Sequence, residues 1–273
     1  MTSRQSFGIF LIERKMQLLS DNIFIHIPYQ KIEEYKPFVF AKKVNLEIYF
    51  AGNVLDEVSL NDVKELKEQF ADYSIRTTFH APFMDLSPGG FDRKIRELTL
   101  FRMRQVLELA GIIHPENIVV HPGFDNLRFG GFENVWFENS ISTWNTVIKE
   151  LPYQDISVTI ENIFEENPFS LVKLVSEINS GIFKICFDIG HFNVFGKIPL
   201  SRWIDSIKPH LRELHIHDNN GKDDEHKALG EGGIDIKNFF ALISGMEKNL
   251  ITTIEAHTKE NALKSLEWLK KNL

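Results

Sequence analysis

The sequence predicts a single-domain α/β fold, a (β/α)8 TIM barrel, over residues 22–273. Short runs rich in β-branched and aromatic residues alternate with longer amphipathic runs along the whole 273-residue chain. This alternation is typical of parallel strands joined by helical crossovers. Eight strand–helix pairs can be counted, and eight pairs in ~250 residues is the size of the closed barrel. A doubly wound open sheet is the alternative, but no G-x-G-x-x-G motif follows the first strand.

The individual elements follow from hydrophobic periodicity and from capping residues. The expected strands are residues 23–27, 44–50, 75–79, 117–120, 156–160, 183–187, 211–216 and 250–254. Ser59, Asp92 and Asp235 are expected helix N-caps, and Gly111 is expected to stop the third helix. The expected helices are 29–42, 59–71, 92–110, 133–150, 168–179, a segment that starts at Pro199, 235–246 and 258–272.

Residues 1–21 are assigned to an N-terminal extension, and the alternative for residues 1–15 is a short helix that closes the bottom of the barrel. Their apolar run, residues 8–12, is too short for a signal peptide and is followed at once by three charged residues. No apolar run in the chain approaches the length that spans a bilayer, so no membrane partner is expected. The single cysteine, Cys186, excludes an intrachain disulfide and favours a reducing, cytoplasmic compartment.

The net charge of −7 counts against nucleic acid as a partner. Nucleic-acid binding proteins usually carry a basic field, because neutralised phosphates supply most of their affinity. A small molecule is therefore the expected partner. The sequence is compatible with a homo-oligomer without specifying one.

Titratable side chains stand in or at the end of all eight expected strands. They are His26, Glu47, His80, His121, Glu161, Asp188, His215 and Glu255. In a barrel of this kind the chemistry gathers at the carboxyl ends of the strands. A lone histidine at a strand end is usually a hydrogen-bonded core residue, but eight titratable groups aimed at one rim indicate a functional site.

The loop after the seventh strand is the densest polar segment of the chain. It contains His217, His226, Asp218, Asp223, Asp224 and Glu225. Imidazole and carboxylate together suit a divalent cation such as Zn²⁺ or Mn²⁺, whereas the plainer interpretation is a polar surface loop. We expect His217 to lie on the side of its strand opposite to His215, unless the strand has already ended.

Four carboxylates would converge at the predicted rim: Glu161, Asp188, Asp224 and Glu255. Like charges a few ångströms apart raise each other's pKa until one group takes up a proton. One or more bound cations would let all four stay ionised. With no thiolate available, the ligand types indicate Zn²⁺, Mn²⁺ or Co²⁺, with one to three ions per chain.

With these motifs the chain resembles the xylose isomerase-like TIM barrel superfamily. That superfamily includes sugar and sugar-phosphate isomerases and epimerases, and also AP endonucleases of the endonuclease IV type (AP endonuclease family 2). The matching motifs extend over nearly the whole chain: F-H-A-P-F at His80, V-V-H-P-G at His121, T-I-E-N at Glu161, C-F-D-I-G-H with Asp188 and His191, H-I-H-D-N at His215, D-E-H-K-A-L-G-E-G with Asp224 and His226, and T-I-E-A-H at Glu255.

The resemblance implies two alternative metal centres. In the isomerase and epimerase branch, the positions of Glu161, Asp188, His215 and Glu255 hold one ion. In the endonuclease branch, further ions are held by the positions of His80, His121, His191, Asp224 and His226. All nine positions are filled here, which suits a polynuclear phosphodiesterase.

The isomerase or epimerase interpretation is nevertheless favoured. The charge balance is acidic, and the F-D-I-G-H-F-N-V-F-G and H-I-H-D-N-N-G segments are more similar to the sugar isomerase branch. By resemblance, Glu161 and Glu255 are the expected catalytic bases in a proton transfer through an enediolate, with a metal ion polarising the sugar carbonyl. The expected substrate-binding residues are His80, His121, His191 and Lys222. A non-catalytic metal- or sugar-binding barrel is a third alternative, which the acids at Glu161 and Glu255 disfavour.

Overall fold

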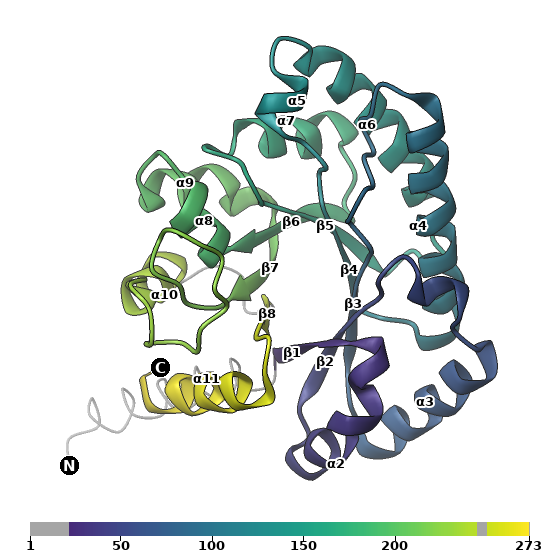
Figure 1. Ribbon diagram of the computed structural model, residues 1–273, viewed down its shortest axis with the longest axis vertical. Helices are drawn as coiled ribbons and strands as arrows, with labels where there is room; N and C mark the ends of the chain where they lie inside the picture. Colours follow the sequence, from purple (N-terminus) through teal and green to yellow (C-terminus); the bar gives the residue numbers. More distant parts are fainter. Residues whose placement is uncertain (1–21, 245–249, 273) are drawn as a thin grey trace, which may run out of the picture.

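The computed structural model describes residues 22–244 and 250–272 and contains a closed parallel barrel (Figure 1). The strands pair in chain order, and β1 also pairs with β8, which closes the ring. The predicted barrel is confirmed. The expected extension 1–21 and the expected helix end at residue 246 lie outside the described residues. The strands are β1 Ile23–Pro28, β2 Asn45–Tyr49, β3 Thr77–His80, β4 Asn117–Val120, β5 Ser157–Glu161, β6 Phe183–Asp188, β7 Leu211–Ile216 and β8 Ile251–Ile254.

A ring of helices surrounds the barrel, and two short helices not expected from the sequence, α5 and α8, lie in the loops after β4 and β6 (Figure 1). Among the described helices, none is long and apolar enough to cross a membrane. The helices are α2 Ile32–Lys42, α3 Leu60–Tyr73, α4 Arg93–Ile113, α5 Asn126–Phe129, α6 Glu133–Lys149, α7 Phe169–Ile178, α8 Ile189–Phe195, α9 Leu200–Ile207, α10 Ile236–Ile243 and α11 Lys259–Asn272. Short 3-10 helices cover Tyr29–Lys31, Val54–Asp56 and Lys208–His210.

The expected N-caps are confirmed by their hydrogen bonds. Side-chain oxygens of Ser59, Asp92 and Asp235 accept from the first-turn amides of α3, α4 and α10 at 3.4, 2.7 and 3.0 Å. The expected stop at Gly111 is wrong. Helix α4 continues to Ile113 and ends at His114, which adopts a left-handed φ of 61°. A glycine is tolerated inside a helix at a modest cost, so it marks an end only where the backbone turns.

The interior of the barrel is polar, whereas the space between strands and helices is apolar. Asn117 on β4 donates to Thr159 on β5 at 2.6 Å, and Thr253 on β8 donates to Glu213 on β7 at 2.7 Å. Asn117 also donates to Glu213 across the barrel. Because buried polar groups must be paired, this network provides a hydrogen-bonded floor beneath the open end of the barrel.

The outer apolar layer is expected to control stability. Trp203 of α9 is fully buried, with its ring centroid 5.7 Å from that of Phe187 on β6. We expect Trp203→Ala to lower the free energy of unfolding by about 3–5 kcal/mol, through lost burial and a residual cavity. Urea denaturation followed by circular dichroism measures this. Leu127→Ala, at a side chain 97% exposed, is the control and should change stability by less than about 0.5 kcal/mol. Equal midpoints for the two variants would contradict the expectation.

Candidate metal centre

The barrel brings the four predicted ligands of a single-ion site together. Glu161 and Asp188 are the last residues of β5 and β6, His215 lies near the end of β7, and Glu255 directly follows β8. One ligand atom from each residue lies within 4.8 Å of the others. Glu161, Asp188 and His215 are fully buried, and the Glu255 side chain is 14% exposed. We call these four residues the first group.

Local hydrogen bonds to the backbone fix the position of Asp188. Its Oδ1 caps α8 by accepting from the amide of His191 at 2.6 Å. Its own backbone amide and carbonyl are both bonded to the side chain of Asn162, each at 2.9 Å. The ends of β5 and β6 are therefore held together, and Asp188 Oδ2 has no hydrogen-bond partner among the described residues.

The donor atoms of the first group fit a divalent cation. Glu161 Oε1, Asp188 Oδ2, His215 Nδ1 and Glu255 Oε2 are all buried, and none has a hydrogen-bond partner among the described residues. Burying an unpaired polar atom costs about 1–3 kcal/mol, and more for charged groups. Four such atoms, one from each residue of one cluster, are the arrangement that a bound cation would satisfy. Three carboxylates and one imidazole suit Zn²⁺, Mn²⁺ or Co²⁺.

Two more histidines contact the other oxygen of Glu161. His80 Nε2 and His121 Nε2 each lie 3.2 Å from Glu161 Oε2. The opposite nitrogen of His80, Nδ1, donates to the carbonyl of Ala81 at 2.9 Å. A neutral His80 would therefore present its Nε2 lone pair to a carboxylate. Either the ring is protonated or a cation lies between the two groups.

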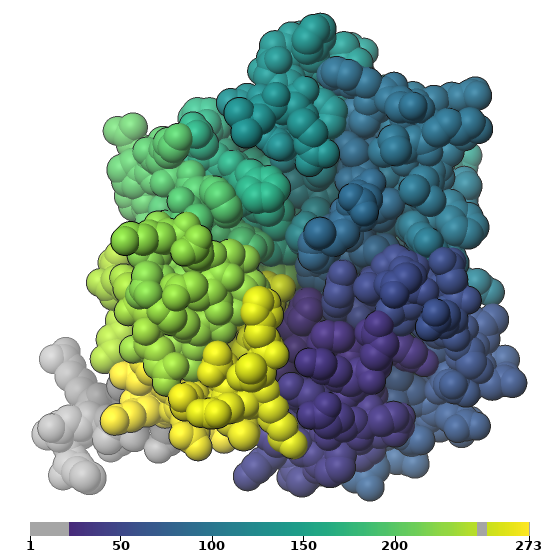
Figure 2. Space-filling view, in the orientation of Figure 1, coloured from purple at the N-terminus to yellow at the C-terminus, as the bar shows by residue number. Residues whose placement is uncertain are grey.

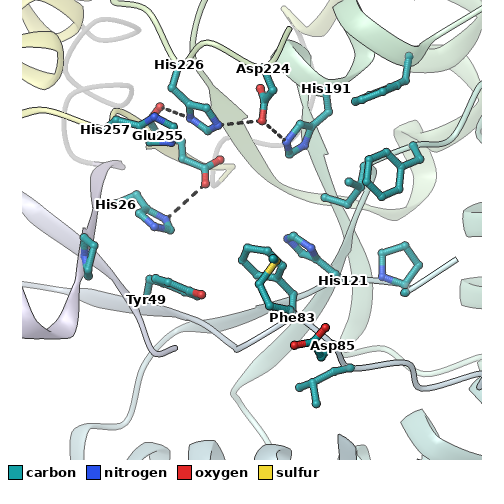
Figure 3. Close-up of a pocket in the computed structure, with 18 of the residues that line it drawn as sticks. His26, Tyr49, Phe83, Asp85, His121, His191, Asp224, His226, Glu255 and His257 are labelled. Atoms are coloured by element: carbon teal, nitrogen blue, oxygen red, sulfur yellow. Dashed lines mark hydrogen bonds and ion pairs between the residues drawn. The ribbon is translucent and has the colours of Figure 1, made fainter. Parts of the chain in front are cut away.

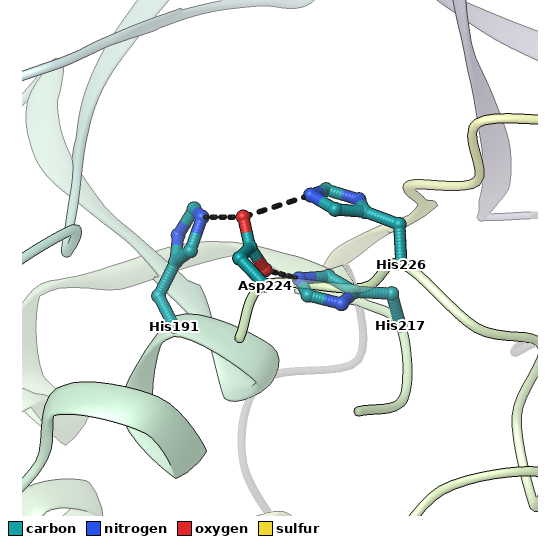
Figure 4. Close-up of side chains that lie close together, drawn as sticks. All are labelled: His191, His217, Asp224 and His226. Atoms are coloured by element: carbon teal, nitrogen blue, oxygen red, sulfur yellow. Dashed lines mark hydrogen bonds and ion pairs between the residues drawn. The ribbon is translucent and has the colours of Figure 1, made fainter. Parts of the chain in front are cut away.

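A second group of possible ligands consists of His191, His217, Asp224 and His226 (Figure 4). Asp224 Oδ2 lies 3.2 Å from His191 Nε2 and 3.0 Å from His226 Nε2. Both histidines repeat the His80 pattern, because Nδ1 of His191 bonds the carbonyl of Asn162 and Nδ1 of His226 bonds that of Glu255, each at 3.0 Å. Metal-ligating histidines commonly donate their other nitrogen to a backbone carbonyl in this way.

The exception allowed for His217, that the strand has ended before it, applies. Side chains two residues apart along a strand point to the same face, and β7 ends at Ile216, just before His217. His217 is buried, with Nε2 3.2 Å from Asp188 Oδ1 and 3.5 Å from Asp224 Oδ1. Its ring lies directly over Gly190, where an added Cβ would approach its Cε1 to 2.0 Å. His217 therefore bridges the two groups.

The loop over residues 217–234 is held in place by Asp218. The two carboxylate oxygens of this buried residue accept from the backbone amides of Gly230 at 2.9 Å and Ile234 at 3.1 Å. Its backbone also pairs with that of Lys227. Asp218 thus folds the loop back on itself, and this fold carries Asp224 and His226 to the barrel mouth.

Opposite charges across the centre shift the pKa values of its members. Burial raises the pKa of Glu161, but the imidazoles of His215 and His121 outweigh it and hold this pKa well below its usual range. Burial lowers the pKa of His226, but Asp224 and Glu255 together outweigh it and raise this pKa to about 9. Without an ion, His215 and His226, whose pKa values are raised, thus carry protons that compensate nearby carboxylates. A divalent cation would displace those protons, since only deprotonated ligands bind metals.

A pocket of about 810 Å³ opens above the centre (Figure 3). Figure 2 shows the surface hollowed where the purple N-terminal and yellow C-terminal segments meet. Asp224, His226, Glu255, His121 and His191 reach the pocket, and Lys31 and Arg128 are its cations. Its apolar wall includes Tyr49, Phe83, Met84, Phe124, Phe164 and Phe195.

The structure separates Lys222 from the other predicted substrate-binding residues. His121 and His191 line the pocket, and His80 lies beneath them on Glu161, whereas Lys222 is exposed in its loop and does not line the pocket. His257, which was not among the residues predicted from the sequence, lines the pocket and stacks on His226 with ring centroids 4.0 Å apart. Its position two residues after Glu255 was the available signal.

Fold and site together define a (β/α)8 barrel with a candidate divalent-metal centre at its mouth. The family model described as "Xylose isomerase-like TIM barrel" matches residues 45–272. The chain is 30% identical to the uncharacterized protein MJ1311 of Methanocaldococcus jannaschii, over 79% of this chain and 76% of that protein. The protein belongs to the xylose isomerase-like TIM barrel family.

Two solved structures are similar over most of the chain. A D-tagatose 3-epimerase-like protein is 27% identical, with a TM-score of 0.78 over 92% of this chain and 96% of that one. The TTHB071 protein from Thermus thermophilus, in a structure from soaking with ZnCl₂, is 23% identical, with a TM-score of 0.77 over 92% and 97%. At 23% identity, the similarity to the TTHB071 protein shows a shared fold.

An ion at the second group would distinguish the polynuclear alternative from a single-ion centre. Asp224→Asn removes the carboxylate that both His191 and His226 face, so an ion held there would be lost and the number of tightly bound Zn²⁺ ions per chain would fall by one. Elemental analysis after dialysis against a weak chelator measures this number. Asp223→Asn, at the exposed neighbouring position, is the matched control and should leave it unchanged. An unaltered ion count in Asp224→Asn would exclude an ion at this group.

Proposed function

We propose that the protein is a divalent-metal-dependent isomerase or epimerase of a sugar or sugar phosphate, acting by proton transfer through an enediolate. The observation that carries this proposal is the set of four buried, unpartnered donor atoms of the first group beneath the pocket. Similarity to the D-tagatose 3-epimerase-like protein supports the choice of a carbohydrate substrate.

A divalent ion held by Glu161, Asp188, His215 and Glu255 would supply polarisation of a carbonyl and its neighbouring hydroxyl, which acidifies the adjacent C–H bond. Glu255 borders the pocket and is the carboxylate placed to remove or return that proton. Glu161 is the second base in this proposal and acts from the opposite side of the barrel. Burial raises the pKa of Glu255, but the imidazoles of His215 and His26 hold it well below its usual range, so this carboxylate is ionised in the metal-free protein.

The pocket wall suits one face of a sugar. Aromatic rings pack against the apolar C–H face of a pyranose or furanose, while hydroxyl groups need hydrogen-bond partners at the floor. Tyr49 and Phe83 provide such rings, and His121 and His191 provide polar groups. Lys31 and Arg128 at the rim would pair with a phosphate.

A second candidate, a polynuclear phosphodiesterase, is favoured by one specific observation. His80, His191 and His226 all bond a backbone carbonyl through Nδ1 and aim Nε2 at a carboxylate. This pattern suits several ions around Glu161 and Asp224. If His80 and His121 held an ion against Glu161 Oε2, that oxygen would be unavailable as a base.

The base role of Glu255 is tested by Glu255→Gln. The amide cannot accept the substrate proton, so kcat for epimerisation should fall by about 10²–10⁴-fold. Activity should be measured by chromatography of the sugar products, together with metal content. Glu267→Gln, at an exposed acid of α11 that does not line the pocket, is the control and should leave kcat unchanged. Full activity with a retained ion in Glu255→Gln would eliminate the base role.

The two candidate reactions are separated by a substrate panel assayed with Mn²⁺, Co²⁺ or Zn²⁺. We expect turnover of a ketose or ketose phosphate, with solvent deuterium appearing at the carbon whose configuration changes, because an enediolate exchanges its proton. The same preparations should be assayed on an abasic oligonucleotide and a small phosphodiester. Phosphodiester cleavage without any sugar turnover would establish the second candidate in place of the first.

A further inference from the structure

Glu47 lies inside the barrel, directly beneath the first group. It is fully buried in β2, and its register partners on the neighbouring strands are His26 and Thr78. The strand-end pattern includes Glu47, but neither candidate reaction gives it a part. Burying a carboxylate costs free energy unless it is paired, so the role of Glu47 can be inferred from its partners.

The carboxylate of Glu47 has two imidazoles and one hydroxyl as partners. His26 Nδ1 lies 3.0 Å from Oε1, Thr78 Oγ1 donates to Oε2 at 3.3 Å, and His215 Nε2 lies 3.2 Å from Oε1. Two of these partners are imidazoles that belong to the candidate site. His215 belongs to the first group, and His26 lines the pocket beside Glu255, at 3.7 Å from its Oε1 (Figure 3).

The contact with Glu47 decides which nitrogen of His215 faces the other ligands. An ionised carboxylate only accepts hydrogen bonds, so the nitrogen that faces it must carry the proton. His215 therefore carries hydrogen on Nε2. Nε2 is in hydrogen-bond geometry with Glu47 Oε2 at 3.3 Å. With an ion bound, Nδ1 would be the nitrogen left with a lone pair, and it lies 3.3 Å from Glu161 Oε1 and 3.2 Å from Glu255 Oε2, the oxygens that would share that ion. This nitrogen is the one without a hydrogen-bond partner among the described residues.

A second buried acid nearby lacks this contact. Glu213 Oε1 is 3.9 Å from His215 Nε2, which is outside hydrogen-bonding distance. Its oxygens are instead bonded by Thr253, at 2.7 Å, and by Asn117. Glu213 is thus a second fully buried glutamate, which belongs to the barrel floor and provides a comparison within the chain. Burial and the nearby Glu47 carboxylate raise its pKa well above the usual range.

We propose that Glu47 is a positioning residue for the metal centre: it accepts a hydrogen bond from His215 Nε2 and thereby turns the Nδ1 lone pair toward the shared ligand point of the first group. The same carboxylate holds His26 at the pocket edge. This role rests on the proposed metal site but not on which reaction that site performs. Carboxylates bonded to a ligating histidine typically contribute about 10–100-fold in metal affinity.

The test compares Glu47→Gln with Glu213→Gln in the full chain. Zn²⁺ affinity is measured at one fixed pH by competition with a chromophoric chelator. We expect Glu47→Gln to weaken binding by the first group about 10–100-fold, since a glutamine can donate to His215 and favour the wrong tautomer. Glu213→Gln should change the affinity by less than about 3-fold, because Glu213 does not bond the histidine. Thermal unfolding of the metal-free proteins shows whether both variants remain folded.

A second measurement uses the unaltered protein and is independent of how the variants fold. Nitrogen-15 NMR of the Zn²⁺-loaded chain distinguishes the two tautomers of each histidine. We expect His215 to carry its proton on Nε2, and in Co²⁺-loaded protein the visible absorption bands should shift in Glu47→Gln but not in Glu213→Gln.

The outcomes separate this inference from the proposed function. Unchanged affinity in Glu47→Gln, equal losses in both variants, or a proton on His215 Nδ1 would overturn the role of Glu47 while leaving the metal site and its reaction standing. An unaltered protein that binds no divalent ion would overturn the metal site, and the role of Glu47 with it.

Discussion

The structure depends on one electrostatic constraint, the convergence of carboxylates at the mouth of the barrel. Glu161, Asp188 and Glu255 come from three different strand ends and meet within a few ångströms around His215. Such a cluster is tolerable only if protons or cations compensate it. Protonated imidazoles of the centre compensate this charge in the metal-free state. A divalent ion would replace these protons, so metal binding is coupled to proton release.

Glu161 is the residue on which the two candidate reactions differ. One oxygen faces the first group, and the other faces His80 and His121. With a single ion, the second oxygen is available to move a substrate proton. With further ions, it becomes a bridging ligand and the chemistry shifts toward activation of water. The two functions therefore differ in metal occupancy more than in the protein scaffold.

The support for the metal centre extends below and beside the ligands. Glu47 and the polar barrel floor lie beneath His215, and Asp218 folds the loop that delivers Asp224 and His226. Backbone carbonyls at Ala81, Asn162 and Glu255 orient three more histidines. The ligands thus depend on rigid strand ends and on one tightly bonded loop, which suits a site that must keep its geometry before any ion binds.

The sequence by itself determined the barrel and the strand-end acids and histidines, because the alternation of strands and helices and the position of a residue at a strand end are local properties. It did not determine the side of the strand taken by His217, the exclusion of Lys222 from the pocket, or the pairing of Glu47 with His215. Those depend on distances between strands far apart in the chain, and only the closure of the barrel sets such distances. The tautomer inferred for His215 was decided in the same way, since it follows from the tertiary neighbour of the opposite ring nitrogen.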